Sequence, residues 1–81
     1  MTGLDMLRRD LGRPDLTAEQ AERLMENPEC VWGMNQAARF RYERGWSVAE
    51  IARKQGCSRG PAQRRIRVWL QRAEAMLNAM G

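Results

Sequence analysis

The chain has 81 residues, 43% of them apolar, so it can bury one small core, and we expect a single domain over residues 1–81. Its net charge of +4 is divided between an acidic segment, residues 1–29 at −3, and a basic one, residues 30–81 at +7, which predicts an anionic partner for the second. Two cysteines without histidine exclude a four-ligand zinc site, and without paired carboxylates or a glycine-rich phosphate loop we predict neither an enzyme nor a cofactor.

The residue types predict an all-α fold. Ala, Leu, Arg, Glu, Gln and Met dominate the chain and β-branched residues are few, a composition that favours helices over strands. We therefore expect a small bundle of four or five helices, with two supporting helices in residues 1–27. The first covers residues 2–12 and ends at Gly12. Three leucines repeat on one of its faces, Leu4, Leu7 and Leu11.

A second helix is predicted to begin after Thr17. The spacing from Thr17 to Gln20 is that of a capping box, in which two side chains satisfy free amides of the first turn. The glutamates that follow suit the positive end of the helix dipole. We expect this helix to end near Glu26.

A third helix is predicted in residues 28–45, before the most basic part of the chain. Asn is a preferred N-cap and Pro is favoured in the first turn, so Asn27 and Pro28 predict a helix from Pro28 to about Arg44. Gly45 ends it, because glycine readily takes the left-handed conformation found after many helices. The expected apolar stripe consists of Val31, Met34, Ala38 and Tyr42, widened by Trp32 and Phe40.

Three local signals define the start of a fourth helix. Ser47 and Glu50 have the spacing of a second capping box, and Trp46 and Ile51 have that of a hydrophobic staple. We expect the helix to run to Gln55.

A turn and a fifth helix complete a predicted helix-turn-helix with an extended C-terminal helix, over residues 46–77. Gly56 turns the chain, Ser58 caps the fifth helix, and its first turn tolerates Pro61 because the missing amide would be unpaired there. Apolar residues then recur at steps of three and four: Ala62, Ile66, Trp69 or Leu70, Ala73, Leu77 and Met80.

The other side of this fifth helix carries the candidate functional residues. Arg can hold guanine and Gln can hold adenine through two hydrogen bonds each, and a short helix, a tight turn and a basic second helix suit the major groove of DNA. A glycine and a free helix N-terminus allow close approach of a phosphate. The predicted contacts to double-stranded DNA are Ser58, Arg59, Gly60, Gln63, Arg64 and Arg67. Arg44 and Ser47 are predicted to contact flanking phosphates.

Residues 40–73 resemble the C-terminal helix-turn-helix of bacterial sigma factors, which reads the promoter −35 element. The aromatic-Arg-Tyr run, glycine, apolar residue and serine of that family correspond to Phe40, Arg41, Tyr42, Gly45, Trp46 and Ser47. Its Glu-Ile-Ala segment and Gly-apolar-Ser turn correspond to Glu50, Ile51, Ala52, Gly56, Cys57 and Ser58, and its apolar recognition-helix positions to Ala62 and Ile66. The chain has no room for the other sigma domains, and Pro61 and the small Ala62 depart from the family's recognition helix.

The turn also resembles that of phage late-gene antiterminators of the Q type. The matching residues are Ala52, Arg53, Lys54, Cys57, Ser58 and Gly60. Together the two resemblances imply a sequence-specific, DNA-binding regulator of transcription, encoded by a phage or mobile element and acting as a repressor, activator or antiterminator.

Other interpretations stay open. The basic face could be a solvated surface of an ordinary bundle, or the chain could be a protein-binding module that docks on RNA polymerase, a sigma factor or a host regulator. A phage packaging subunit assembled in a ring is a third possibility. The acidic residues of the N-terminal third could be solvated, dock a protein or mask the basic face; they are Asp15, Glu19, Glu22, Glu26 and Glu29.

Two further expectations concern association and compartment. The C-terminal apolar stripe either packs against the first two helices or forms the seam of a homodimer. No signal peptide or membrane span is apparent, so we expect a cytoplasmic protein without a membrane partner. Cys30 and Cys57 are then expected to be reduced and buried, although their number alone also allows one disulfide.

Overall fold

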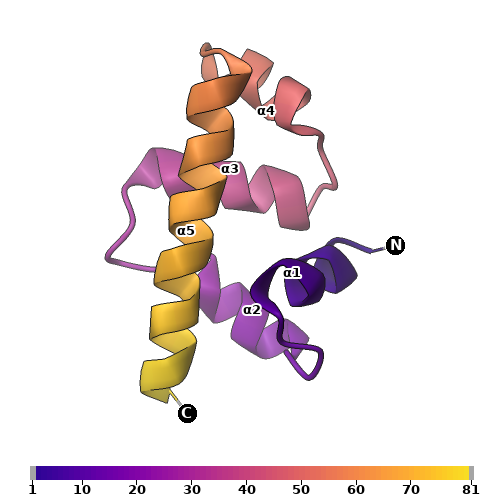
Figure 1. Ribbon diagram of the computed structural model, residues 1–81, viewed down its shortest axis with the longest axis vertical. Helices are drawn as coiled ribbons and strands as arrows, with labels where there is room; N and C mark the ends of the chain where they lie inside the picture. Colours follow the sequence, from indigo (N-terminus) through magenta and orange to yellow (C-terminus); the bar gives the residue numbers. More distant parts are fainter. Residues whose placement is uncertain (1, 81) are drawn as a thin grey trace.

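The computed structural model describes residues 2–80, apart from the side chain of Trp32, and this part of the chain is all-helical. Its five helices are α1 (Gly3–Leu11), α2 (Ala18–Leu24), α3 (Trp32–Tyr42), α4 (Val48–Gln55) and α5 (Arg59–Met80). The long helix α5 extends along the molecule, with α3 crossing its middle, α4 beside its N-terminal end and α1 and α2 beside its C-terminal half (Figure 1). The small all-α bundle is confirmed.

Helix starts and stops follow local chemistry at α2 and α4. Thr17 and Gln20 form the predicted capping box at α2. At α4 the hydroxyl of Ser47 accepts the backbone amide of Glu50 at 3.2 Å. It also donates to the Glu50 carboxylate at 3.1 Å, a bond that the predicted box does not contain. Gly56 follows α4 in the left-handed conformation, with φ 69°.

The predicted start of the third helix is wrong, because Asn27 closes a turn instead of capping a helix. Asn27 is 2% exposed, and its side-chain oxygen accepts the backbone amide of Glu29 at 3.0 Å. Its carbonyl accepts the side-chain amide of Asn35 at 3.1 Å. The side-chain bond is one that an N-cap makes, but the Asn27 carbonyl accepts the Cys30 amide in a turn as well as Asn35, so it does not start a helix at Pro28. Helix α3 begins later and ends at Tyr42.

The apolar stripe predicted for this helix is correct only in part. Val31 precedes α3 and is 68% exposed, so it does not belong to the core. Ala38, Phe40 and Tyr42 are buried as predicted. Ala37, outside the predicted stripe, is also fully buried. The late start of α3 explains the error at Val31, because this residue lies outside the helix whose periodicity the stripe assumed.

The core is organised around Trp69 of α5, which has no exposed surface. Its indole nitrogen donates to the Asn35 side chain at 3.0 Å, and its ring lies 5.8 Å from that of Tyr42. The Tyr42 hydroxyl donates to Asp10 of α1 at 2.7 Å. Burial, together with this carboxylate, raises the pKa of Tyr42 far above its usual value. Trp69, and not the half-buried Leu70, therefore occupies the core position that the sequence left open.

The rest of the α5 stripe is buried as predicted, except at its end. The buried members are Ala62, Ile66, Ala73 and Leu77. Met80 is 39% exposed. Both cysteines are free; Cys30 is buried, whereas Cys57 is only half-buried, contrary to the prediction. No helix within residues 2–80 combines the length and apolarity needed to span a membrane.

The approach of α1 to the C-terminal end of α3 depends on Gly3. A β-carbon at this position would lie 1.8 Å from the Tyr42 carbonyl oxygen, which is far inside van der Waals contact. The two backbones can therefore meet only where a side chain is missing. This contact places α1 against the core, close to the bond between Tyr42 and Asp10.

Candidate nucleic-acid interface

Helices α4 and α5 are joined by the turn of residues 56–58. The amide of Cys57 donates back to the Ala52 carbonyl at 3.0 Å, which is the bond of a Schellman motif after a left-handed Gly56. Ile51 and Ala62, one from each helix, are fully buried. The turn and the packing of α4 on α5 hold the N-terminal end of α5 against α4.

A hydrogen-bond network that the sequence prediction missed ties this unit to α3. Gln55 at the end of α4 donates to the Gly33 carbonyl at 2.9 Å and to Gln36 at 3.1 Å. Its oxygen accepts Arg65 of α5 at 2.7 Å, and Arg65 also lies 3.4 Å from the Cys57 sulfur. Arg65 is thus a structural residue. The only signal for this in the sequence is its place on α5, three residues after the buried Ala62.

The six predicted DNA-contacting residues are all exposed at the N-terminal end of α5: Ser58, Arg59, Gly60, Gln63, Arg64 and Arg67. The structure brings them together on about 12 Å of helix, given the rise of an α-helix. Their side chains have no hydrogen-bond or ion-pair partner within residues 2–80, so the three guanidinium groups are available to an external anion.

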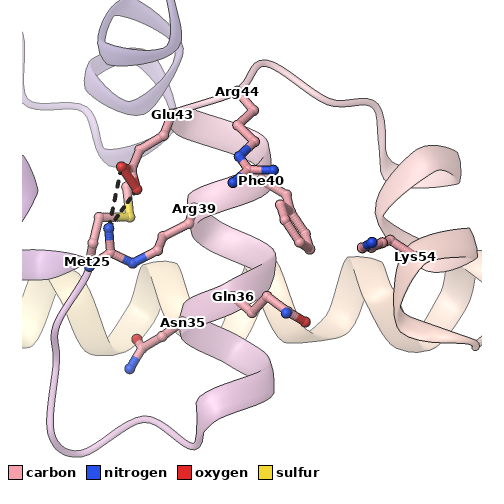
Figure 2. Close-up of a pocket in the computed structure, with 8 residues that line it drawn as sticks. All are labelled: Met25, Asn35, Gln36, Arg39, Phe40, Glu43, Arg44 and Lys54. Carbon is pink, nitrogen blue, oxygen red and sulfur yellow. Dashed lines mark hydrogen bonds and ion pairs between the residues drawn. The ribbon is translucent and has the colours of Figure 1, made fainter.

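The two predicted phosphate contacts, Ser47 and Arg44, already interact with other side chains of the domain. The Ser47 hydroxyl is occupied by Glu50, as described above, and the Glu50 carboxylate would repel a phosphate there. The Arg44 guanidinium lies over the rings of Phe40 and Trp46, at 5.4 and 5.8 Å from their centres. It lines a hollow on the side of α3 away from α5 (Figure 2). The structure therefore does not join Arg44 to the α5 residues.

Residues 2–29, the described part of the N-terminal segment with a net charge of −3, do not cover the α5 face. α1 and α2 lie beside the C-terminal half of α5, whereas the six residues lie at its other end (Figure 1). Part of the acidic charge is neutralised locally by Arg39 of α3. This guanidinium pairs with Glu43 at 2.7 Å, Glu22 at 3.6 Å and Glu26 at 3.8 Å. The three pairs are exposed to solvent and contribute little each.

The C-terminal stripe of α5 is mostly used inside the monomer. Trp69, Ala73 and Leu77 are buried against the other helices. Within residues 2–80, the only exposed large apolar side chain on α5 is Met80. A homodimer through this helix would therefore use Met80 and half-buried side chains, which are Val68, Leu70 and Met76.

Comparison of the chain with protein-family models, curated proteins and solved structures gives no match. In the described part of the chain, no three His, Cys, Asp or Glu side chains are grouped so that they could hold a metal ion. A function must therefore be inferred from the charge and geometry of the surface.

Proposed function

We propose that this chain is a sequence-specific DNA-binding regulator of transcription, in which α4, the turn and α5 act as a helix-turn-helix. One observation carries the proposal. Arg59, Arg64 and Arg67 project from one end of a helix whose opposite face is buried, and none of them has a partner within residues 2–80. Unpaired cations on a supported helix match the requirements of a major-groove reader.

The side chains on this face supply two kinds of contact. Arg64 and Gln63 can each form two hydrogen bonds to a purine edge and so discriminate between bases. Gly60 is exposed, and a β-carbon there would meet nothing within 4 Å, so the α5 backbone is open to a phosphate. The first turns of α5 can thus supply both hydrogen bonds to base edges, which read the sequence, and contacts to DNA phosphates, which position the protein.

The resemblances to sigma-factor and antiterminator helix-turn-helix units support a role in transcription. They favour a repressor, activator or antiterminator of a phage or mobile element, acting in the cytoplasm on double-stranded DNA. RNA polymerase or another transcription protein is a natural additional partner for such a regulator.

The test begins with selection of bound duplexes from a random pool, followed by affinity measurements on the selected site. Arg64→Ala is expected to weaken specific binding by about 1–3 kcal/mol and to relax the preference at one base position. Arg23→Ala is the charge-matched control, because Arg23 lies on α2, away from the α5 face, and its Glu19 pair is exposed. Equal losses on specific and random DNA would make Arg64 a phosphate contact, and equal losses for both variants would contradict the interface.

A protein-binding module is the second candidate, favoured by the exposed glutamates of α2 and its C-terminal flank. Their side chains are 82%, 59% and 69% exposed at Glu19, Glu22 and Glu26. A gel shift against genomic fragments at two salt concentrations separates the candidates. A steep loss of binding with salt indicates phosphate neutralisation and supports DNA binding. Absence of binding at both concentrations supports the protein-docking function.

A further inference from the structure

An open hollow of about 690 Å³ lies along α3, with Met25 after α2 on one side and Lys54 of α4 on the other (Figure 2). Seen from its mouth, α5 passes behind α3 (Figure 2), and α5 contributes no residue to the lining. The hollow is therefore separate from the proposed DNA-binding face and lies on the other side of α3. Its wall toward α4 contains Gln36, Arg44 and Lys54, with the Phe40 ring between them.

The charges that line the hollow do not cancel. The one carboxylate of the lining, Glu43, is held by Arg39 at 2.7 Å, and this guanidinium also pairs with Glu22 and Glu26, which lie outside the lining. Arg44 and Lys54 remain, and neither has an ion-pair partner within residues 2–80. The Lys54 ammonium group points toward the Phe40 ring from the α4 side, while Arg44 lies above that ring (Figure 2). Two cations thus face a common space.

Two of the donors around this space, Arg44 and Gln36, are positioned by contacts within the fold, whereas Lys54 is exposed. Phe40 and Trp46 stack at 4.4 Å between centres, and Arg44 lies over both rings, a favourable cation–π arrangement. The Gln36 oxygen accepts the Gln55 amide at 3.1 Å. Because its oxygen is occupied, Gln36 offers its amide N–H groups, for which residues 2–80 supply no acceptor.

We propose that this hollow is a phosphate-binding site, with Arg44 and Lys54 supplying charge and Gln36 a neutral donor. A phosphate group carries several acceptor oxygens, and charge-assisted bonds from separate donors are the strongest contacts available to it. Arg44, which the sequence predicts to contact a phosphate, would bind the phosphate here. The α5 face would remain free to bind a DNA duplex. Its occupancy does not depend on the proposed DNA-binding function.

Titration with inorganic phosphate at constant pH and ionic strength, followed by amide NMR, tests the site. We expect saturable shifts around residues 36, 44 and 54 and in the Gln36 side chain. Lys54→Gln and Arg44→Gln should each weaken binding about tenfold, the loss typical of one charge-assisted bond. Arg23→Gln removes the same charge from α2, outside the lining of the hollow and away from the α5 face, and should leave the affinity unchanged. Equal weakening by all three variants, or shifts that chloride reproduces, would overturn the proposal.

Lys54 is the only lysine in the chain, which provides a second readout. Bound phosphate should slow acylation of its side-chain amine relative to the α-amino group, measured by mass spectrometry. Unchanged acylation at phosphate concentrations that saturate the NMR shifts would remove Lys54 from the site and overturn the proposal as stated.

The source of the phosphate is distinguished by comparing inorganic phosphate with a phosphodiester dinucleotide. Tighter binding of inorganic phosphate supports a site for a free phosphate compound. Equal or tighter binding of the phosphodiester supports a site for a nucleic-acid backbone. Binding of neither contradicts the site, and this result would leave the gel-shift test of the α5 face unaffected.

Discussion

The two ends of α5 differ in how their polar side chains are used. Toward the C-terminus, Trp69 donates to Asn35, Arg72 donates to the Glu29 carbonyl, and Asn78 accepts a bond from Arg13. At the N-terminal end, exposed arginines have no such partner within residues 2–80. One helix thus stabilises the bundle at one end and presents uncompensated charge at the other. A site that binds an external anion requires positively charged side chains that have no partner inside the protein.

The largest effect expected from this comparison is at Trp69. Trp69→Ala removes the most buried large side chain and its bond to Asn35, and should lower the free energy of unfolding by about 3–5 kcal/mol. Arg67→Ala, two residues earlier but exposed, should change it by no more than about 0.5 kcal/mol. Urea unfolding followed by circular dichroism measures both. If Trp69→Ala unfolds the domain completely, Trp69→Phe, which should cause a smaller loss, can replace it in this comparison. Equal changes in the free energy of unfolding for substitutions at positions 67 and 69 would refute the difference between the two ends of α5.

Gly3 of α1, which is packed against α3, and Gly60 of α5, which is exposed, should also respond differently to an added methyl group. Gly3→Ala drives a β-carbon into the Tyr42 carbonyl and should destabilise the protein by about 1–3 kcal/mol. Gly60→Ala meets open space within the first turn of α5 and should stabilise it by up to about 1 kcal/mol. Thermal unfolding of the two variants provides the comparison. A stable Gly3→Ala protein would show that α1 does not pack as described.

A smaller loss than at Trp69 or Gly3 is expected on removal of a helix cap, and it should be similar at α2 and α4. Ser47→Ala and Thr17→Ala each remove a side chain that accepts a backbone amide at a helix start, and each should cost about 1 kcal/mol. A loss at Ser47 much greater than at Thr17, measured by urea unfolding, would mean that the α4–α5 unit depends on more than local capping.

Sequence reasoning succeeded where the decisive interactions are local. The starts of α2 and α4 follow from Thr17 and Ser47, and the stop after α4 follows from Gly56, because each element is determined by residues within one turn. The exposure of Arg64 and Arg67 follows from helical periodicity opposite Ile66. Each of these features requires no knowledge of distant residues.

The failures arise where a distant residue competes for the same group. The Asn27 side chain bonds the Glu29 amide as an N-cap would, but its carbonyl is bound by the side chain of Asn35, eight residues later. No sequence feature around Gly3 predicts its close approach to Tyr42. The hollow likewise requires Lys54 and Arg44 to face each other across α3 and α4, a relation that no spacing in one helix encodes.

Residues 2–29, with their net charge of −3, and the unpaired guanidinium groups of α5 lie toward opposite ends of the bundle, which gives the molecule an electric dipole. In the field of a polyanion such a molecule experiences a torque before it makes any contact, so encounters begin preferentially with the basic end leading. The carboxylates at the rear are repelled at the same time. Productive collisions should therefore be more frequent than those of an equally charged but unpolarised protein, and added salt should reduce this advantage by shortening the range of the field.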